Sequence, residues 1–366
     1  MPNLLYNRYQ KQIKLDGFGI EAQEKLSNAK LLVIGAGGLG CASLPYLAAA
    51  GVGHLGIVDF DKVELSNLHR QVLYTHEDIS QYKAELVAQK LVKQNIEITV
   101  KPYILKIDNS NALDIISGYD LVIDGSDNFY TRYIVNDACV ILKKPLVYGS
   151  VMKYEGQVGV FNIAESGNIY TTNYRDLFPK PPFESEFYSC DDLGVLGVLP
   201  GVIGAMQATE AIKIITHIGM PLCNKILTYQ ALHNSFFEFV VNKNKALVEF
   251  PHSKEQFINY DYHEFCGEVA EVNEITLKEL YHSIENNNTL IIDVREADEL
   301  PIITDFAAIH IPLSQLSESE NIFSSYQKIV LICNSGTRSK KGVSILHNRF
   351  PKLNIYSLKN GLNSLY

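Results

Sequence analysis

A cysteine loop near the C-terminal end of the chain is the pattern best suited to covalent chemistry. Cys333 opens the hexapeptide Cys-Asn-Ser-Gly-Thr-Arg, after the apolar run 328–332 and before a stretch predicted to be helical. A thiol at a strand-to-helix turn lies under the free N–H groups of the helix, which favour a thiolate and can hold an anion bound to its sulfur. Arg338 ends the loop with a fixed cation. The loop therefore predicts a nucleophilic cysteine that can supply sulfur.

A glycine-rich loop far upstream predicts a nucleotide site. Residues 35–40 read Gly-Ala-Gly-Gly-Leu-Gly, directly after the apolar run 30–34 and before an Ala/Leu-rich helix over 41–50. Glycines let the backbone approach a phosphate, and the helix N-terminus favours its negative charge. Asp59 ends the second predicted strand, where a carboxylate can bind ribose hydroxyls. Taken alone, this pattern fits NAD as well as ATP.

Charged and polar residues after the glycine loop favour a triphosphate over NAD. Asn67 and Arg70 closely follow the second strand, and Lys83 begins the next predicted helix. Asp127 and Asn128 follow the strand 120–124, at the edge where open α/β sheets bind ligands, and a carboxylate there can hold Mg²⁺. The alternatives are surface ion pairs for Arg70 and Lys83 and a helix cap for Asp127.

The order of predicted elements indicates two α/β domains. Strands over 30–34, 54–60, 96–105, 120–124 and 146–148 alternate with helices, which predicts a mostly parallel sheet. Residues 167–200 are predicted to be a long functional loop. We expect a nucleotide-binding domain over 1–250, a linker over 251–274 and a second domain over 275–366. Strands over 290–294, 307–313 and 328–332 belong to the second domain.

Composition excludes several classes of function. A net charge of −9 argues against a nucleic-acid partner, and no basic run suggests a membrane surface. The N-terminal residues lack the apolar core of a signal peptide, and no stretch approaches a membrane span. Six cysteines are scattered without a disulfide-like framework. We therefore expect a cytoplasmic protein.

The motifs together resemble a known enzyme family over residues 8–238. They are similar to the adenylyltransferases of ubiquitin-like sulfur-carrier proteins, which serve molybdopterin and thiamine biosynthesis and are related to ubiquitin-activating enzymes. The matching segments are 35–40, 59–61, 65–71, Lys83, 127–128, 154–157 and 194–204. The C-terminal part separately resembles the rhodanese family through 293–296, 310–313 and the cysteine loop. This resemblance implies a Rossmann-like adenylyltransferase domain followed by a small α/β rhodanese domain.

The resemblance also implies roles for individual residues. Gly38 and the rest of the glycine loop would cradle ATP, Asp59 would bind the ribose beside Asp61, and Asp127 would bind Mg²⁺. The residues that the resemblance assigns to ATP are Gly35, Gly37, Gly38, Gly40, Asp59, Asp61, Asn67, Arg70, Lys83, Asp127 and Asn128. In the family, an N-terminal arginine reaches the phosphates of the neighbouring site in a homodimer. Lys11 stands at that position, so the charge is kept but the bidentate fork is lost.

The family has cysteines in two further roles, as ligands of a structural zinc and as a thiol in a mobile loop. Family members usually carry two Cys-x-x-Cys pairs that bind structural zinc. Residues 173–176, which align with the first pair, contain no cysteine, and only Cys266 remains of the second. Four ligands are needed, so no zinc is expected. Cys190 aligns with a cysteine in a mobile loop of the family; it is either a catalytic thiol or a residue without a catalytic role.

In the rhodanese-like part, four residues separate Cys333 from Arg338, a loop that suits a persulfide, whereas related phosphatase loops carry one residue more. Asp293 and Arg295 are predicted to form a structural ion pair, and His310 a structural hydrogen bond.

The reaction that the resemblance implies has two stages. ATP activates the terminal glycine carboxylate of a carrier ending in Gly-Gly, and a Cys333 persulfide, loaded by a separate donor, then gives a thiocarboxylate.

Two alternatives remain open. One is an NAD-dependent oxidoreductase, and the other is a docking module for a ubiquitin-like partner with reduced or no adenylation activity. The pathway is also open among molybdopterin, thiamine, tRNA thiolation and cysteine synthesis.

Overall fold

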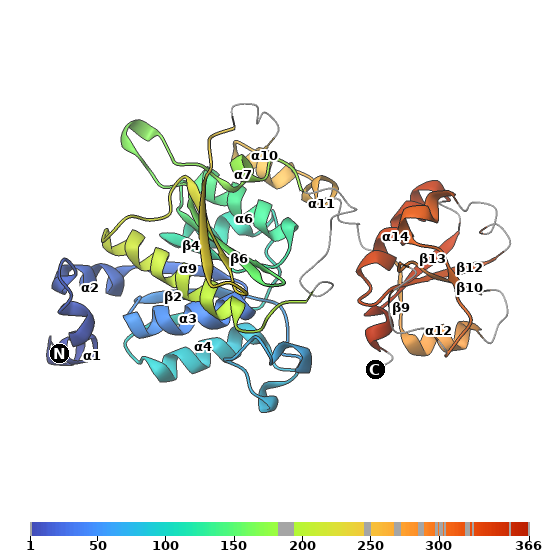
Figure 1. Ribbon diagram of the computed structural model, residues 1–366, viewed down its shortest axis with the longest axis horizontal. Coiled ribbons are helices and arrows are strands. Elements are labelled where there is room, and N and C mark those ends of the chain that lie inside the picture. Colours follow the sequence, from blue (N-terminus) through green and yellow to red (C-terminus); the bar gives the residue numbers. More distant parts are fainter. Residues whose placement is uncertain are drawn as a thin grey trace. The chain divides into compact units, whose positions relative to one another are not determined.

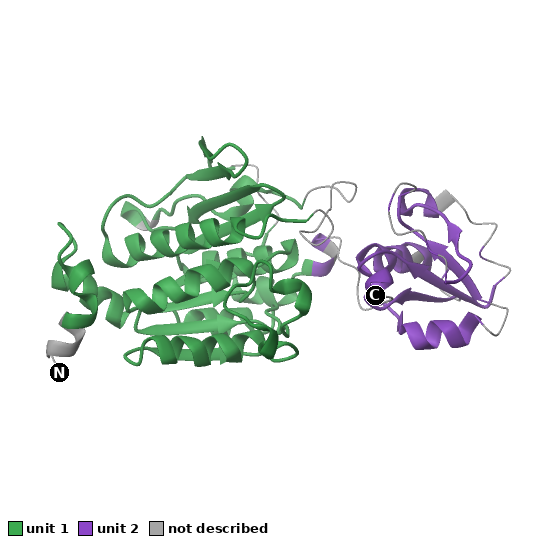
Figure 2. Ribbon diagram, turned by 60° about the horizontal axis from the view of Figure 1, so that its bottom comes forward, with its two compact units in different colours: residues 1–182, 188–262 green, residues 183–187, 263–366 purple. Residues whose placement is uncertain are grey.

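A computed structural model describes most of the chain: residues 2–181, 194–244, 250–266, 272–284, 289–296, 299, 303, 305–318, 323, 326–350 and 353–364. The chain divides into two compact units. Unit 1 comprises residues 1–182 and 188–262, and unit 2 comprises residues 183–187 and 263–366 (Figure 2). In the described part, no helix is long and apolar enough to cross a membrane.

Unit 1 is built on an eight-stranded sheet in the order β3-β2-β1-β4-β5-β6-β7-β8. The strands β3, β2, β1, β4 and β5 are parallel, and β6, β7 and β8 extend the sheet in antiparallel fashion. This confirms the predicted mostly parallel, Rossmann-like domain. The strand bounds are β1 Lys30–Ile34, β2 His54–Val58, β3 Thr99–Tyr103, β4 Leu121–Asp124, β5 Leu146–Met152, β6 Glu155–Phe161, β7 Lys225–Gln230 and β8 Ser235–Val240.

Helices cover both faces of this sheet because its central strands are apolar on both sides. Figure 1 shows α3 and α4 on one face and α6 on the other. The helix bounds are α1 Pro2–Ile13, α2 Gly19–Asn28, α3 Gly38–Ala50, α4 Lys83–Gln94, α5 Ala112–Ser117, α6 Phe129–Leu142, α7 Tyr174–Leu177, α9 Leu199–Thr216, α10 Lys254–Asn259 and α11 Tyr262–Phe265.

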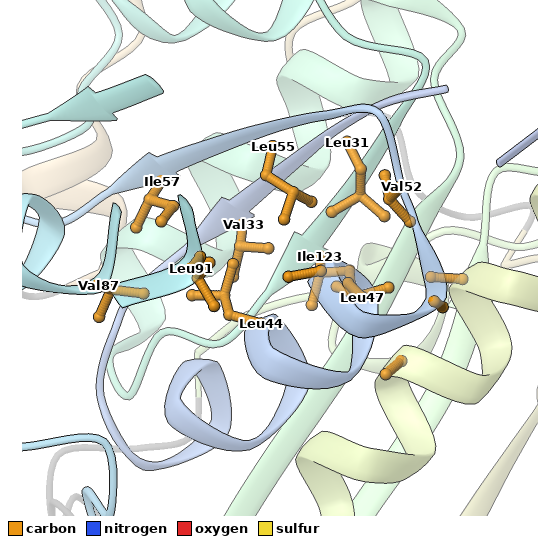
Figure 3. Packing of buried hydrophobic residues seen from close by; sticks show 14 of the residues in the cluster. Leu31, Val33, Leu44, Leu47, Val52, Leu55, Ile57, Val87, Leu91 and Ile123 are labelled. Carbon is orange, nitrogen blue, oxygen red and sulfur yellow. The ribbon is translucent and has the colours of Figure 1, made fainter. Parts of the chain in front are cut away.

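The core under α3 and α4 fixes the position of the glycine loop. Alternate residues of β1 and β2 point to this face and meet leucines and a valine of the two helices, as Figure 3 shows. Because these side chains are almost fully buried, β1, the loop after it and α3 form one rigid element. The residues in contact include Leu31, Val33, Leu55, Ile57, Leu44, Leu47, Val87 and Leu91.

The structure differs from the sequence prediction at three places in unit 1. The antiparallel strands β6, β7 and β8 were not expected; β6 contains two glycines and most of β8 is exposed, so neither gives a strong apolar pattern. The predicted loop 167–200 contains α7 and the first residues of α9, while residues 182–193 lie outside the described part. The predicted linker 251–274 begins with α10 and α11, where Phe257 and Tyr262 are buried in unit 1.

Unit 2 contains a five-stranded parallel sheet in the order β11-β10-β12-β13-β9. Its strands are β9 Glu274–Ile275, β10 Thr289–Asp293, β11 Ile309–His310, β12 Lys328–Ile332 and β13 Asn354–Leu358. Its helices are α12 Leu277–Ile284 and α14 Thr337–Arg349. Clusters of buried side chains lie on both faces of the sheet. The smaller α/β domain is thereby confirmed.

Candidate active sites

The glycine loop has a conformation that other residues cannot adopt. Gly35 has a φ of +91°, and a Cβ there would lie 2.9 Å from the carbonyl oxygen of Gly125. A Cβ on Gly40 would lie 2.2 Å from the oxygen of Gly35. Helix α3 begins at Gly38, so its free N–H groups face the space above the loop. The loop is thus a backbone surface suited to an anion.

Asp59 and Tyr74 hold this loop by its Ala36 peptide. The Ala36 N–H donates to Asp59 Oδ2 at 2.7 Å, and the Tyr74 hydroxyl donates to the Ala36 carbonyl at 2.7 Å. Asp59 Oδ1 accepts from the Asp61 N–H at 2.8 Å. Burial raises the pKa of Asp59 to about 6, against the opposing effect of Lys83. Each carboxylate oxygen keeps a free lone pair, so Asp59 can still accept a hydroxyl hydrogen bond.

A pocket of about 940 Å³, its open mouth included, lies at the carboxyl edge of the parallel strands. It brings together most of the residues expected at a nucleotide site. Those that line it are Gly35, Gly37, Gly38, Asp59, Asp61, Arg70, Lys83, Asp127 and Asn128. Residues distant in sequence meet here because the strands that carry them are neighbours in the sheet.

Three predicted residues do not line the pocket. Gly40 lies within the first turn of α3 and packs on the loop itself. Asn67 is buried and accepts the Glu64 N–H at 3.2 Å, which closes a turn before Arg70. Lys11 is exposed on α1. Cys190 lies outside the described residues.

The two cations that line the pocket have different surroundings. Lys83 is 5% exposed, and its Nζ lies 3.1 Å from Asp61 Oδ2. Arg70 is more open, and its Nη1 donates to the Ser66 carbonyl at 3.0 Å. Both side chains present positive charge to the pocket from its β2 side. They can neutralise phosphate oxygens once a nucleotide is bound.

Asp127 stands at the mouth of the pocket on the loop after β4. Asn128, not Asp127, caps α6: its Oδ1 accepts the Thr131 N–H at 2.8 Å. The Asp127 carboxylate is exposed and accepts a long hydrogen bond of 3.3 Å from Asn128 Nδ2. One carboxylate beside a phosphate site is the usual protein contribution to nucleotide-bound Mg²⁺, so these residues fit that ion.

Several pocket residues were not identified from the sequence. Leu105, Lys106 and Ile107 follow β3, and the rule that ligands bind at carboxyl strand ends would have indicated them. Gln71 lines the pocket with its buried Oε1 unpaired among the described residues. Others among them are Thr131, Arg132, Val151, Val195 and Pro200. Val195 and Pro200 lie in the segment 194–204, which matched the family but was given no role at the nucleotide site.

Cys333 forms a second candidate site in unit 2. It is fully buried between β12 and α14, and its Sγ accepts the Gly336 N–H at 3.2 Å and the Ser339 N–H at 3.4 Å. The Ser339 hydroxyl lies 3.5 Å from the same sulfur. Gly336 has a φ of +91°, which turns its N–H toward Sγ. These groups are placed to donate hydrogen bonds to the sulfur, and the nucleophilic role of Cys333 stays a prediction.

Arg338 is a paired cation rather than an isolated one. Its guanidinium forms a two-point ion pair with Glu299, with Nη1 on Oε1 and with Nη2 2.6 Å from Oε2. Glu299 also accepts from Asn334 Nδ2 at 3.2 Å, and Arg338 holds the pKa of Glu299 below its usual range. Glu299 was not identified from the sequence, because nothing local relates it to a loop 34 positions later.

The ion pair expected between Asp293 and Arg295 and the hydrogen bond expected of His310 are both present. Arg295 Nη2 lies 2.8 Å from Asp293 Oδ2, and Arg295 Nε contacts both carboxylate oxygens. His310 Nε2 lies 2.7 Å from the Arg295 carbonyl oxygen. These contacts hold the loop after β10 rather than approach Sγ.

Residues 173–176 do not fit the structural zinc of the family. They form the start of α7, in which Arg175 is buried and pairs with Asp137. Cys266 is buried, and no group of three or more potential metal ligands occurs in the described part of the chain. A tetrahedral site needs four ligands, so the absence of structural zinc stays a prediction.

Comparison with known proteins gives a family for each part of the chain. The model of the ThiF family matches residues 9–249. The chain belongs to the ThiF family. A rhodanese-like domain matches residues 276–366, so the ThiF-family domain is followed by a rhodanese-like one.

Two relatives and one solved structure illustrate the match. The sulfur carrier protein adenylyltransferase of Thermus thermophilus is 46% identical over 71% of this chain and 96% of its own length. The adenylyltransferase and sulfurtransferase MOCS3 of Drosophila grimshawi is 38% identical over 98% of this chain and 83% of its own. The crystal structure of Escherichia coli MccB with ATP has a TM-score of 0.57 at 25% identity, covering 66% of this chain and 73% of that one.

Proposed function

We propose that the protein uses ATP and Mg²⁺ to adenylylate the C-terminal glycine of a ubiquitin-like sulfur carrier, and then transfers sulfur to it from Cys333. The observation that carries the proposal is the presence of two candidate sites on one chain. A glycine-loop pocket lined by Arg70, Lys83 and Asp127 is joined to a cysteine loop with donors aimed at its sulfur. The two-domain relatives named as adenylyltransferases and sulfurtransferases support this combination.

In the first stage, the carrier carboxylate attacks the α-phosphorus of ATP and pyrophosphate leaves. The glycine loop and the N-terminus of α3 would hold the phosphates, and Asp59 would accept a ribose hydroxyl. Arg70 and Lys83 would offset the charge that moves onto pyrophosphate. Asp127 would hold Mg²⁺, which supplies further charge neutralisation when bound. The protein therefore contributes mainly positioning and electrostatics.

In the second stage, the outer sulfur of a Cys333 persulfide attacks the acyl-adenylate carbonyl and expels AMP. The product is an acyl disulfide between the carrier and Cys333. A thiol that attacks Cys333 Sγ then releases the carrier thiocarboxylate and forms a new disulfide, which cellular thiols reduce. Cys190 is our candidate for that thiol. A persulfide donor must reload Cys333 after each turnover.

The proposed function also suggests an oligomeric state and a cellular location. We propose a homodimer in which Lys11, exposed on α1, contributes its charge to the pocket of the second copy. We propose a cytoplasmic location, since the cysteines of the described part are all free thiols.

One experiment tests both stages. The protein is incubated with ATP, magnesium, thiosulfate, a thiol reductant and a carrier ending in Gly-Gly, and the mass of the carrier is measured. Replacement of oxygen by sulfur adds about 16 mass units, the value for a thiocarboxylate. Asp127→Ala should abolish both this gain and ATP–pyrophosphate exchange, whereas Cys333→Ala should abolish the gain but keep the exchange. A carrier that gains sulfur with Asp127→Ala would contradict the proposal.

A further inference from the structure

One pair of opposite charges is completely buried in unit 1. Arg175 and Asp137 are both 0% exposed. Arg175 Nε donates to Asp137 Oδ1 at 2.8 Å and Nη2 to Oδ2 at 2.7 Å. Asn136 Nδ2 and the Tyr262 hydroxyl donate to the same carboxylate at 3.0 and 2.8 Å. Burying two charges is unfavourable unless their hydrogen bonds are satisfied, as this carboxylate's are.

Aromatic rings enclose the guanidinium. The Arg175 carbon Cζ lies 4.8 Å from the ring centre of Tyr133, 5.6 Å from that of Phe250 and 5.7 Å from that of Tyr260. Such cation–ring contacts gain strength where water is excluded. The enclosing side chains come from α6 and from residues 250–262. The ion pair therefore joins three parts of the chain: α6, α7 and the last segment of unit 1.

Two of these parts are followed in the sequence by the cysteines proposed for sulfur transfer, Cys190 and Cys333. Helix α7 ends at Leu177, shortly before the segment that carries Cys190, and the Phe178 carbonyl accepts the Tyr133 hydroxyl at 2.9 Å. Tyr262 is the last residue of unit 1, and the chain beyond it continues into unit 2, which carries Cys333. The ion pair thus fixes the starting points of both segments.

We propose that Arg175, Asp137 and Tyr262 are positioning residues for sulfur transfer, which hold these two segments by a buried ion pair in place of a structural metal. The inference rests on the two-stage function proposed above. Residues 173–176 are the position at which the family's first cysteine pair aligns, and here that position supplies the arginine of the pair. None of the three residues lines the nucleotide pocket. Adenylation should therefore tolerate mild changes that sulfur transfer does not.

The test compares the two stages in the full-length protein. Tyr262→Phe removes one hydrogen bond to Asp137, and Arg175→Lys keeps the charge but loses the two-point contact. We expect both variants to retain ATP–pyrophosphate exchange within about twofold and to lose about fivefold or more in the rate of carrier thiocarboxylate formation. Tyr229→Phe, which removes a hydroxyl bonded to Asn234 at the β7–β8 hairpin, is the matched control and should change neither rate.

A metal measurement completes the test. We expect the purified wild-type protein to contain no stoichiometric zinc and its melting temperature to be the same with and without EDTA. One zinc per chain together with a lower melting temperature in EDTA would overturn the inference. Equal losses in exchange and thiocarboxylate formation, or no loss in either variant, would overturn it too. A wild-type protein that makes no thiocarboxylate would instead contradict the proposed function, on which the inference depends.

Discussion

At the scale of single residues, one carboxylate in each site affects how that site binds its ligand. Asp59 accepts two backbone N–H groups and lies at the bottom of the pocket, so the same side chain shapes the glycine loop and faces the ligand. Glu299 instead neutralises the cation of the cysteine loop. Both effects depend on charge and can be measured by removing it without changing the shape of the side chain.

Binding of the nucleoside part should weaken as the pH falls through about 6. Burial raises the pKa of Asp59 to about 6, so the folded protein takes up this proton at a higher pH than the unfolded chain does. That protonation stabilises the fold below pH 6, an effect lost as the pH rises, but it removes a hydroxyl acceptor. Adenosine, which has no phosphate to titrate, is the probe for calorimetry. The Asp59→Asn variant should bind adenosine weakly at every pH. If its affinity for adenosine changed with pH as that of the wild type does, the prediction would be contradicted.

Glu299→Gln should speed the loading of Cys333 from thiosulfate. The substitution removes a negative charge from beside Arg338, which makes the loop more attractive to a dianion, and we expect a gain of about fivefold at low ionic strength that shrinks in high salt. Formation of the Cys333 persulfide is followed by mass. Glu279→Gln removes the same charge from the first turn of α12 and should give no gain. If both substitutions changed the loading rate equally, the net charge of the protein would explain the change and the prediction would be contradicted.

At the scale of elements, the unit made by β1, the glycine loop and α3 is held by close backbone packing. The first turn of α3 approaches the loop so closely that Gly40 has no room for a side chain. In α9, by contrast, a Cβ on Gly201 would have no described atom within 4 Å outside the backbone of its own helix. Gly40 and Gly201 therefore differ in whether the packing requires a glycine.

Gly40→Ala should destabilise unit 1 and abolish nucleotide binding. The added Cβ would lie 2.2 Å from a backbone oxygen that cannot turn away, and we expect a loss of about 2–3 kcal/mol in the free energy of unfolding. Gly201→Ala should instead gain about 0.5–1 kcal/mol from a lower entropy of the unfolded chain. Urea unfolding and ATP titration check both. A stable Gly40→Ala protein that binds ATP would show that the loop can shift.

At the scale of the whole molecule, two units with separate cores carry the two sites. The described residues of each site belong to one unit, so we expect a substitution in one site to leave the other folded. The connection between the units then matters mainly by keeping the second site at high local concentration near the first.

Two inactive variants should therefore restore activity when mixed. Asp127→Ala keeps the cysteine loop, and Cys333→Ala keeps the nucleotide pocket. We expect thiocarboxylate formation to reappear in the mixture, to rise with protein concentration and to stay below the wild-type rate, because transfer now occurs between chains. Mass analysis of the carrier measures this. A mixture as inactive as its components would mean that transfer requires one continuous chain.

The sequence by itself determined the parallel strands, the glycine loop and the cysteine loop, because apolar runs, glycines and a thiol at a strand-to-helix turn act over short distances along the chain. It also led to the family, with Asp59, Lys83 and Asp127 near one sheet edge. Only the tertiary structure decided which distant residues complete each site. Asn67 and Gly40 support the loops instead of lining the pocket, Glu299 pairs with Arg338, and Arg175 meets Asp137. Such contacts depend on packing between elements far apart in sequence, which no local pattern records.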